Sequence, residues 1–156
     1  MTGLVPWAGQ VFREGESDGG GLADALVAEH AAVFAYGPVG AWLAEDDAET
    51  ARDAEEAHRA RRDLLLLTLA ERDVPAPTPE PGYELPFPVT DEDSARELAL
   101  LVEERVAGVW RAALPQLAPA DRELAVTALI DAAVRATGWR QSAGVTPAVV
   151  PFPGAP

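Results

Sequence analysis

The chain of 156 residues contains no cysteine. This absence excludes disulfide bonds, thiolate metal ligands and cysteine nucleophiles, and it agrees with a reducing compartment. The longest apolar run, residues 64–69, is interrupted by Thr68 and is far too short to span a bilayer. The first ten residues have neither a basic segment nor an apolar one, so we expect no secretion signal. These observations predict a cytoplasmic protein that does not enter membranes.

Basic and aromatic residues are also scarce. Only 12 Lys and Arg residues stand against 26 Asp and Glu residues, which gives a formal net charge of −14. A chain this acidic repels phosphate backbones, so nucleic acids and anionic membrane surfaces are excluded as expected partners. Aromatic residues make up only 6% of the chain, which would fill a β-sandwich poorly, whereas small side chains suit helices packed closely together. The sequence therefore predicts an all-α fold.

The hydrophobic periodicity predicts four helices, at about residues 22–43, 48–72, 90–114 and 120–141. Residues 1–21 are rich in glycine and acidic side chains, and they read as a flexible leader. Residues 143–156 carry several prolines and no charge, which is typical of an extended tail. The expected folded body is therefore a four-helix bundle over residues 22–142.

A long proline-rich connector separates the second predicted helix from the third. Residues 73–89 include six prolines, which excludes a helix and disfavours a central strand. At about 3.1 Å per residue, the crossover at 74–89 reaches roughly 50 Å, whereas a helix of about 25 residues is roughly 38 Å long. The connector can therefore run the whole length of the bundle. Two helical hairpins joined in this way have the ferritin-like topology.

Each predicted helix places ionisable groups on an inward or near-inward position. On the second helix, Glu55, His58 and Arg62 are spaced i, i+3 and i+7, so they share one stripe with apolar residues. The candidate core cluster, taken over all four helices, consists of Glu29, His30, Glu55, His58, Arg62, Glu103, Asp131 and Arg135.

One interpretation of this cluster is a metal centre. A di-metal carboxylate bundle uses one Glu from each of two helices and a Glu-x-x-His from each of the other two. Glu29, Glu55, His58 and Glu103 match part of that ligand set, and iron or manganese would be the metal. The fourth helix has Asp131 and Arg135 where a second Glu-x-x-His is required. The match is therefore incomplete.

The other interpretation is a buried ion-pair network, in which Arg62 and Arg135 replace the charge of the metal by pairing with Glu55, Asp131 or Glu29. On this leading interpretation the protein is a structural or ligand-binding bundle that needs no cofactor and is not an enzyme. The alternative is a redox enzyme that depends on one or two metal ions. A small-molecule pocket without metal is a third interpretation of the same residues.

Five segments resemble an uncharacterised ferritin-like domain family common in high-GC bacteria. They are AEHAAVFAYG at 28–37, AHRARRD at 57–63, YELPFPV at 83–89, LIDAAVR at 129–135 and PFPG at 151–154. The resemblance implies a ferritin-like four-helix bundle but brings no established activity. It marks Glu29, His30, His58, Arg62, Asp131 and Arg135 as the positions to examine. A homodimer formed through an alanine-rich helix face is expected by analogy of fold alone.

Overall fold

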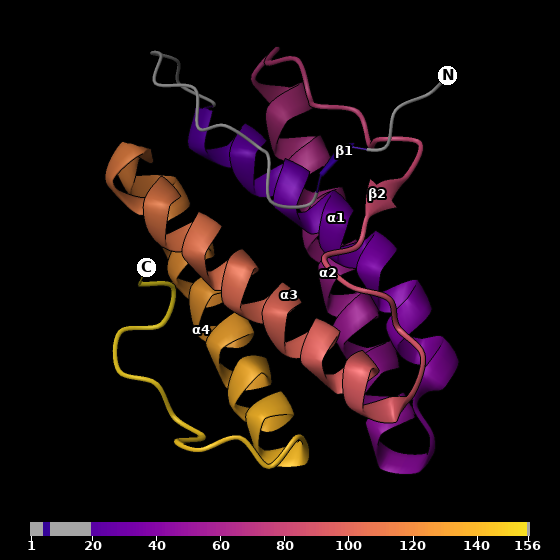
Figure 1. Ribbon diagram of the computed structural model, residues 1–156. Coiled ribbons are helices and arrows are strands. Elements are labelled where there is room, and N and C mark those ends of the chain that lie inside the picture. The colour runs from indigo at the N-terminus through magenta and orange to yellow at the C-terminus, as the bar shows by residue number, and fades with distance from the viewer. Residues whose placement is uncertain (1–4, 7–19, 156) are drawn as a thin grey trace.

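Four long helices account for most of the computed structural model, which describes residues 5–6 and 20–155 (Figure 1). They are α1 (Gly20–Trp42), α2 (Glu45–Glu71), α3 (Glu92–Ala113) and α4 (Pro119–Ser142). The 3-10 helix η1 (Leu114–Gln116) follows α3, and the two-residue strands β1 (Val5–Pro6) and β2 (Tyr83–Glu84) pair in parallel. The prediction of an all-α fold is confirmed.

The helix boundaries follow the local chemistry of the chain. The sequence predicts a turn at residues 45–47 and a helix start near Ala48, but α2 begins at Glu45, because acidic side chains are favourable in the first turn of a helix. At the start of α3, the Ser94 backbone N–H donates to the Asp91 carboxylate at 2.8 Å, and the Asp91 N–H donates to the Ser94 hydroxyl at 3.1 Å. This capping box confirms the start signal read from the sequence.

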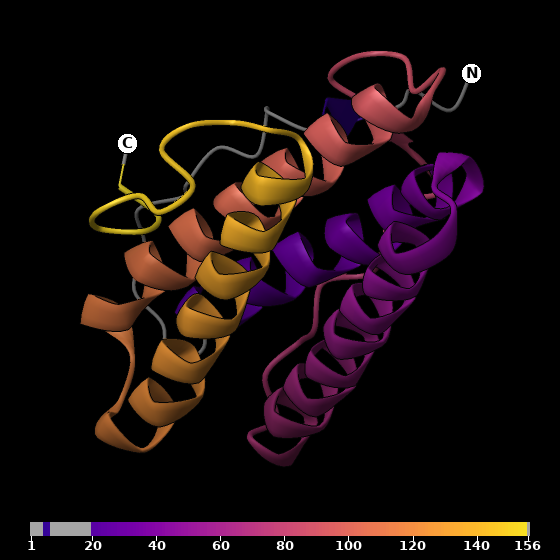
Figure 2. The same ribbon diagram turned by 90° about the horizontal axis from the view of Figure 1, so that it is seen from below.

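The helices pack as two hairpins. Close packing joins α1 to α2, α3 to α4 and α1 to α3, while α2 and α4 approach each other less closely. Figure 2 shows α2 and α4 on the same side of the bundle. The seam between them is bridged by polar side chains near its ends, where Arg72 donates to Asp121 at 2.6 and 2.8 Å and Ser142 donates to Asp47 at 2.8 Å. One face of the bundle is therefore held together by charge.

The segment between α2 and α3 runs from the end of α2 through β2 to the opposite end of the bundle, where α3 begins (Figure 1). Tyr83 fastens it, since this ring is buried and lies 5.2 Å from the ring of Phe34 on α1. Most of the predicted leader lies outside the described residues. Within the part of the chain that the structure describes, no helix is long and apolar enough to cross a membrane.

Candidate functional site

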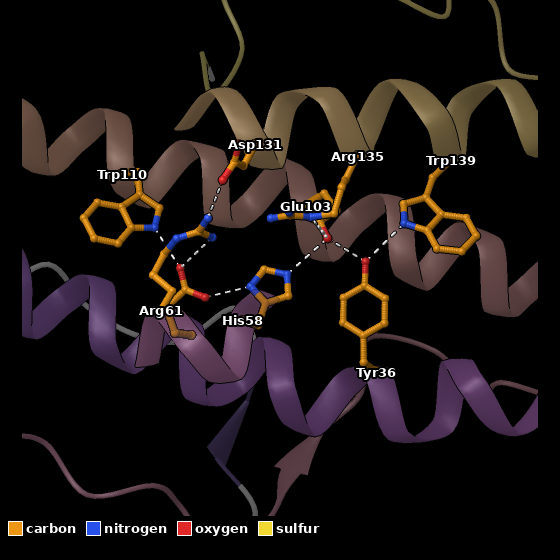
Figure 3. Close-up of polar contacts among 9 residues, drawn as sticks. Tyr36, His58, Arg61, Glu103, Trp110, Asp131, Arg135 and Trp139 are labelled. Carbon is orange, nitrogen blue, oxygen red and sulfur yellow. Dashed lines mark hydrogen bonds and ion pairs between the residues drawn. The ribbon is translucent and has the colours of Figure 1, made fainter. Parts of the chain in front are cut away.

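His58 lies at the centre of a buried polar cluster between the helices (Figure 3). Its Nδ1 is 2.7 Å from Oε2 of Glu29 on α1, and its Nε2 is 3.1 Å from Oε1 of Glu103 on α3. All three side chains are fully buried. A neutral imidazole has one N–H and can donate to only one carboxylate, whereas an imidazolium donates to both. The geometry therefore favours the protonated ring.

The pKa shifts of His58 and Glu103 also favour a protonated His58 ring. Burial alone would lower the pKa of His58, but the hydrogen bonds and charges of Glu103 and Glu29 outweigh it and raise the pKa. Burial would likewise raise the pKa of Glu103, but His58, Arg135 and Tyr36 together hold it below its ordinary value. The proton therefore belongs to His58, and Glu103 is ionised.

Two arginines complete the charge balance of this cluster. Arg61 on α2 donates from Nη2 to Asp131 on α4 at 2.8 Å, and its Nη1 lies 3.6 Å from Glu29. Arg135 on α4 donates from Nε to Glu103 at 3.0 Å. Three carboxylates thus face three cationic groups, the third of which is the imidazolium. This balance matters because an unpaired buried charge costs several kcal/mol.

Neutral donors fill most of the remaining hydrogen-bonding capacity. Trp110 donates from its indole nitrogen to Oε1 of Glu29 at 2.8 Å. Tyr36 donates to Oε1 of Glu103 at 2.6 Å and accepts from the indole of Trp139 at 3.1 Å. Burial and the neighbouring Glu103 charge raise the pKa of Tyr36 well above its usual value, so the hydroxyl keeps its proton. The polar ends of these large aromatic side chains are what allow them to be buried here.

The cluster brings together five of the eight residues that the sequence marked, namely Glu29, His58, Glu103, Asp131 and Arg135. The other three lie elsewhere. Glu55 is partly exposed and pairs with Arg59 one turn along α2, and Arg62 pairs with its neighbour Asp63. His30 is buried, but on the side of α1 that faces the connector.

The two misplaced residues of α2, Glu55 and Arg62, have one geometric cause. The buried stripe of α2 runs through Ala51, Ala54, His58, Arg61 and Leu65. The predicted stripe steps by four residues from Ala51 to Glu55 and from His58 to Arg62. The buried stripe instead steps by three, to Ala54 and to Arg61. A single-residue slip therefore exchanged the buried arginine for its exposed neighbour. The sequence pattern does not predict the hydrogen bonds of Trp110 and Trp139, although a buried indole N–H needs an acceptor.

Comparison with known proteins places this architecture in a family. The family described as Domain of unknown function (DUF4439) matches residues 21–156. The chain belongs to this family. The DUF4439 chain is also similar to the crystal structure of a conserved hypothetical protein, rv2844, from Mycobacterium tuberculosis, at 38% identity and a TM-score of 0.78. That similarity covers 83% of this chain and 99% of the other. No curated protein matches the chain.

The donor set of this DUF4439 cluster does not fit a di-metal centre. Both ring nitrogens of His58 face carboxylates, and Glu29 and Glu103 are each paired with a guanidinium. Oε2 of Glu103 is buried without a hydrogen-bond partner, but one free oxygen falls short of the three or more ligands that protein metal sites use. Among the described residues, no group of three or more His, Asp or Glu side chains is arranged to hold an ion.

Proposed function

We propose that this protein is a ferritin-like four-helix bundle in which a buried ion-pair network stands in place of a di-iron centre. Its two hairpins, and a connector that runs the length of the bundle, support the ferritin-like topology. The polar cluster draws side chains from all four helices, as the metal centres of such bundles do. On this proposal the protein acts by binding and not by catalysis, and no metal cofactor is required.

The observation that carries the proposal is the position of His58 between two carboxylates. Each carboxylate has its own guanidinium, from Arg61 or Arg135. A divalent cation would have to displace His58 from Glu29 or Glu103 and would then lie beside two fixed positive charges. Both effects oppose metal binding, because like charges within a few ångströms repel strongly in a buried site.

Metal analysis tests the proposal directly. The protein is expressed with iron and manganese supplied, and it is purified without chelator or a histidine tag. We expect far less than one ion per chain, and we expect that Arg61→Ala destabilises the fold. A content of about one or two ions per chain, lost on His58→Ala, would instead establish the metal-dependent redox enzyme of this superfamily.

Two further expectations belong to the same proposal. A cytoplasmic location agrees with a chain that uses no cysteine. A homodimer rests on analogy of fold, and analytical ultracentrifugation of the purified protein measures it.

A further inference from the structure

The tail that follows α4 is fastened to the bundle at two points. At its start, the Val145 N–H donates to the Arg140 carbonyl at 2.8 Å. Near its end, Gly154 presses so closely on α3 that a Cβ there would lie 2.6 Å from the Ala107 carbonyl oxygen. Gly154 also has a φ of +75°, which favours glycine. Figures 1 and 2 show the tail leaving α4 and returning towards α3 between these points.

A hollow of about 1230 Å³ lies between this tail and the groove of α3 and α4. Its floor is made of small residues, including Gly108 and Ala112 of α3 and Ala133 of α4, which leave space where larger side chains would fill the groove. Its rim carries large apolar side chains that are 55% to 77% exposed, namely Ile130, Val134, Val149 and Phe152. Apolar exposure on this scale in one place marks a binding surface.

The charges of the hollow are few and predominantly positive. Of the described residues that line it, only Glu104, Arg105 and Arg140 are charged. Arg140 forms an ion pair with Glu104 through Nη2, and its Nε is buried with no hydrogen-bond partner. An arginine in an apolar hollow suits a carboxylate, because the guanidinium offers paired donors to two oxygens.

We propose that the hollow under the tail binds a long-chain aliphatic carboxylate, with the chain over the floor of small residues and the carboxylate at Arg140. The apolar lining suits the hydrocarbon, and the guanidinium of Arg140 complements the head group. The site shares no residue with the cluster around His58, and it rests on the proposed function only in that the protein acts by binding.

Calorimetric titration of the full chain with saturated fatty acids, from octanoate to palmitate and below their micelle concentrations, tests this site. We expect the affinity to rise about fourfold for each added methylene until the hollow is filled. The primary alcohol of the same length lacks the charged head group, so we expect it to bind about tenfold more weakly.

Four variants locate the site. Ala133→Leu places a larger side chain on the floor and is expected to weaken fatty-acid binding at least tenfold. Ala60→Leu makes the same change on an exposed position of α2 and is expected to leave binding unchanged. Arg140→Gln is expected to remove the preference for acid over alcohol, and Arg140→Lys is expected to restore part of it.

The proposal is overturned if no fatty acid binds saturably, if acid and alcohol bind equally, or if Ala133→Leu behaves like Ala60→Leu. A second copy of the chain could instead cover the hollow. The proposal is therefore also overturned if the protein binds no fatty acid and forms a dimer that Ala133→Leu dissociates and Ala60→Leu does not. A metal-free, stable protein that fails these titrations refutes this site alone and leaves the ion-pair network standing.

Discussion

The two histidines of this chain are both buried, yet their surroundings differ completely. His58 is enclosed by the carboxylates of Glu29 and Glu103, and its pKa is raised. His30 lies beside the connector with its Nε2 buried and without a hydrogen-bond partner, and its pKa is lowered. The comparison teaches that burial alone does not set the charge of a histidine. Burial lowers the pKa of His30, whereas two carboxylate partners outweigh burial at His58 and raise its pKa.

Two neighbouring arginines on α2, Arg61 and Arg62, are divided between the surroundings of His58 and those of His30. Burial lowers the pKa of His30, and the nearby charge of Arg62 adds to that effect, outweighing the backbone of Pro77 and the charge of Asp63. Arg61, the preceding residue, serves the other site, where it pairs with Glu29 and Asp131. Adjacent residues of one helix therefore belong to two separate polar environments, namely the cluster around His58 and the surroundings of His30.

Truncating each histidine to alanine gives the largest expected difference. His58→Ala leaves two buried carboxylates without the cation between them, and we expect it to lower the free energy of unfolding by about 3–5 kcal/mol. His30→Ala removes a ring with an unsatisfied nitrogen, and we expect a loss of no more than about 1–2 kcal/mol. Urea denaturation followed by circular dichroism measures both. If His58→Ala does not fold, His58→Gln provides the measurement, and equal effects at the two positions would contradict the comparison.

Truncating the neighbouring arginines gives a smaller difference. Arg61→Ala removes part of the positive charge that balances Glu29, and we expect it to lower the free energy of unfolding by about 2–3 kcal/mol. Arg62→Ala removes a partly exposed ion pair with Asp63, so we expect less than about 1 kcal/mol. The same denaturation experiment measures the pair. A larger effect of Arg62→Ala than of Arg61→Ala would contradict the place of Arg61 in the buried cluster.

The smallest expected effect is on the pH dependence of the free energy of unfolding, to which His58 and His30 contribute with opposite signs. His58 has a raised pKa, so its stabilisation is complete below about pH 6.5 and is lost as the pH rises through the folded value. His30 has a lowered pKa, so the unfolded chain takes up its proton first and stability falls as the pH drops below about 6.5. Each histidine contributes a slope of at most about 1.4 kcal/mol per pH unit.

Unfolding free energies measured from about pH 5 to pH 9 in two variants separate these slopes. His58→Gln is expected to flatten the profile on the alkaline side, and His30→Gln is expected to flatten it on the acid side. An alkaline slope that persists in His58→Gln would mean that the ring is neutral in the native protein.

The sequence predicted the four helices because their apolar stripes and capping residues are local signals, as the pairing of Asp91 with Ser94 illustrates. It also identified Glu29, His58 and Glu103 as polar residues on apolar faces. It did not separate Arg61 from Arg62, because steps of three and four are equally good on a helix and only packing against a neighbour selects one. Which carboxylate meets which cation depends on how helices far apart in sequence are rotated against one another, and no local pattern encodes that rotation.

The polar seam between α2 and α4 has a consequence for how the molecule opens. α2 is packed closely against α1, but it meets α4 through charged contacts such as that of Arg72 with Asp121. Dissolved ions screen partly exposed charges and leave apolar packing almost untouched. We therefore expect added salt to speed amide exchange most at the ends of α2, where these charged contacts lie.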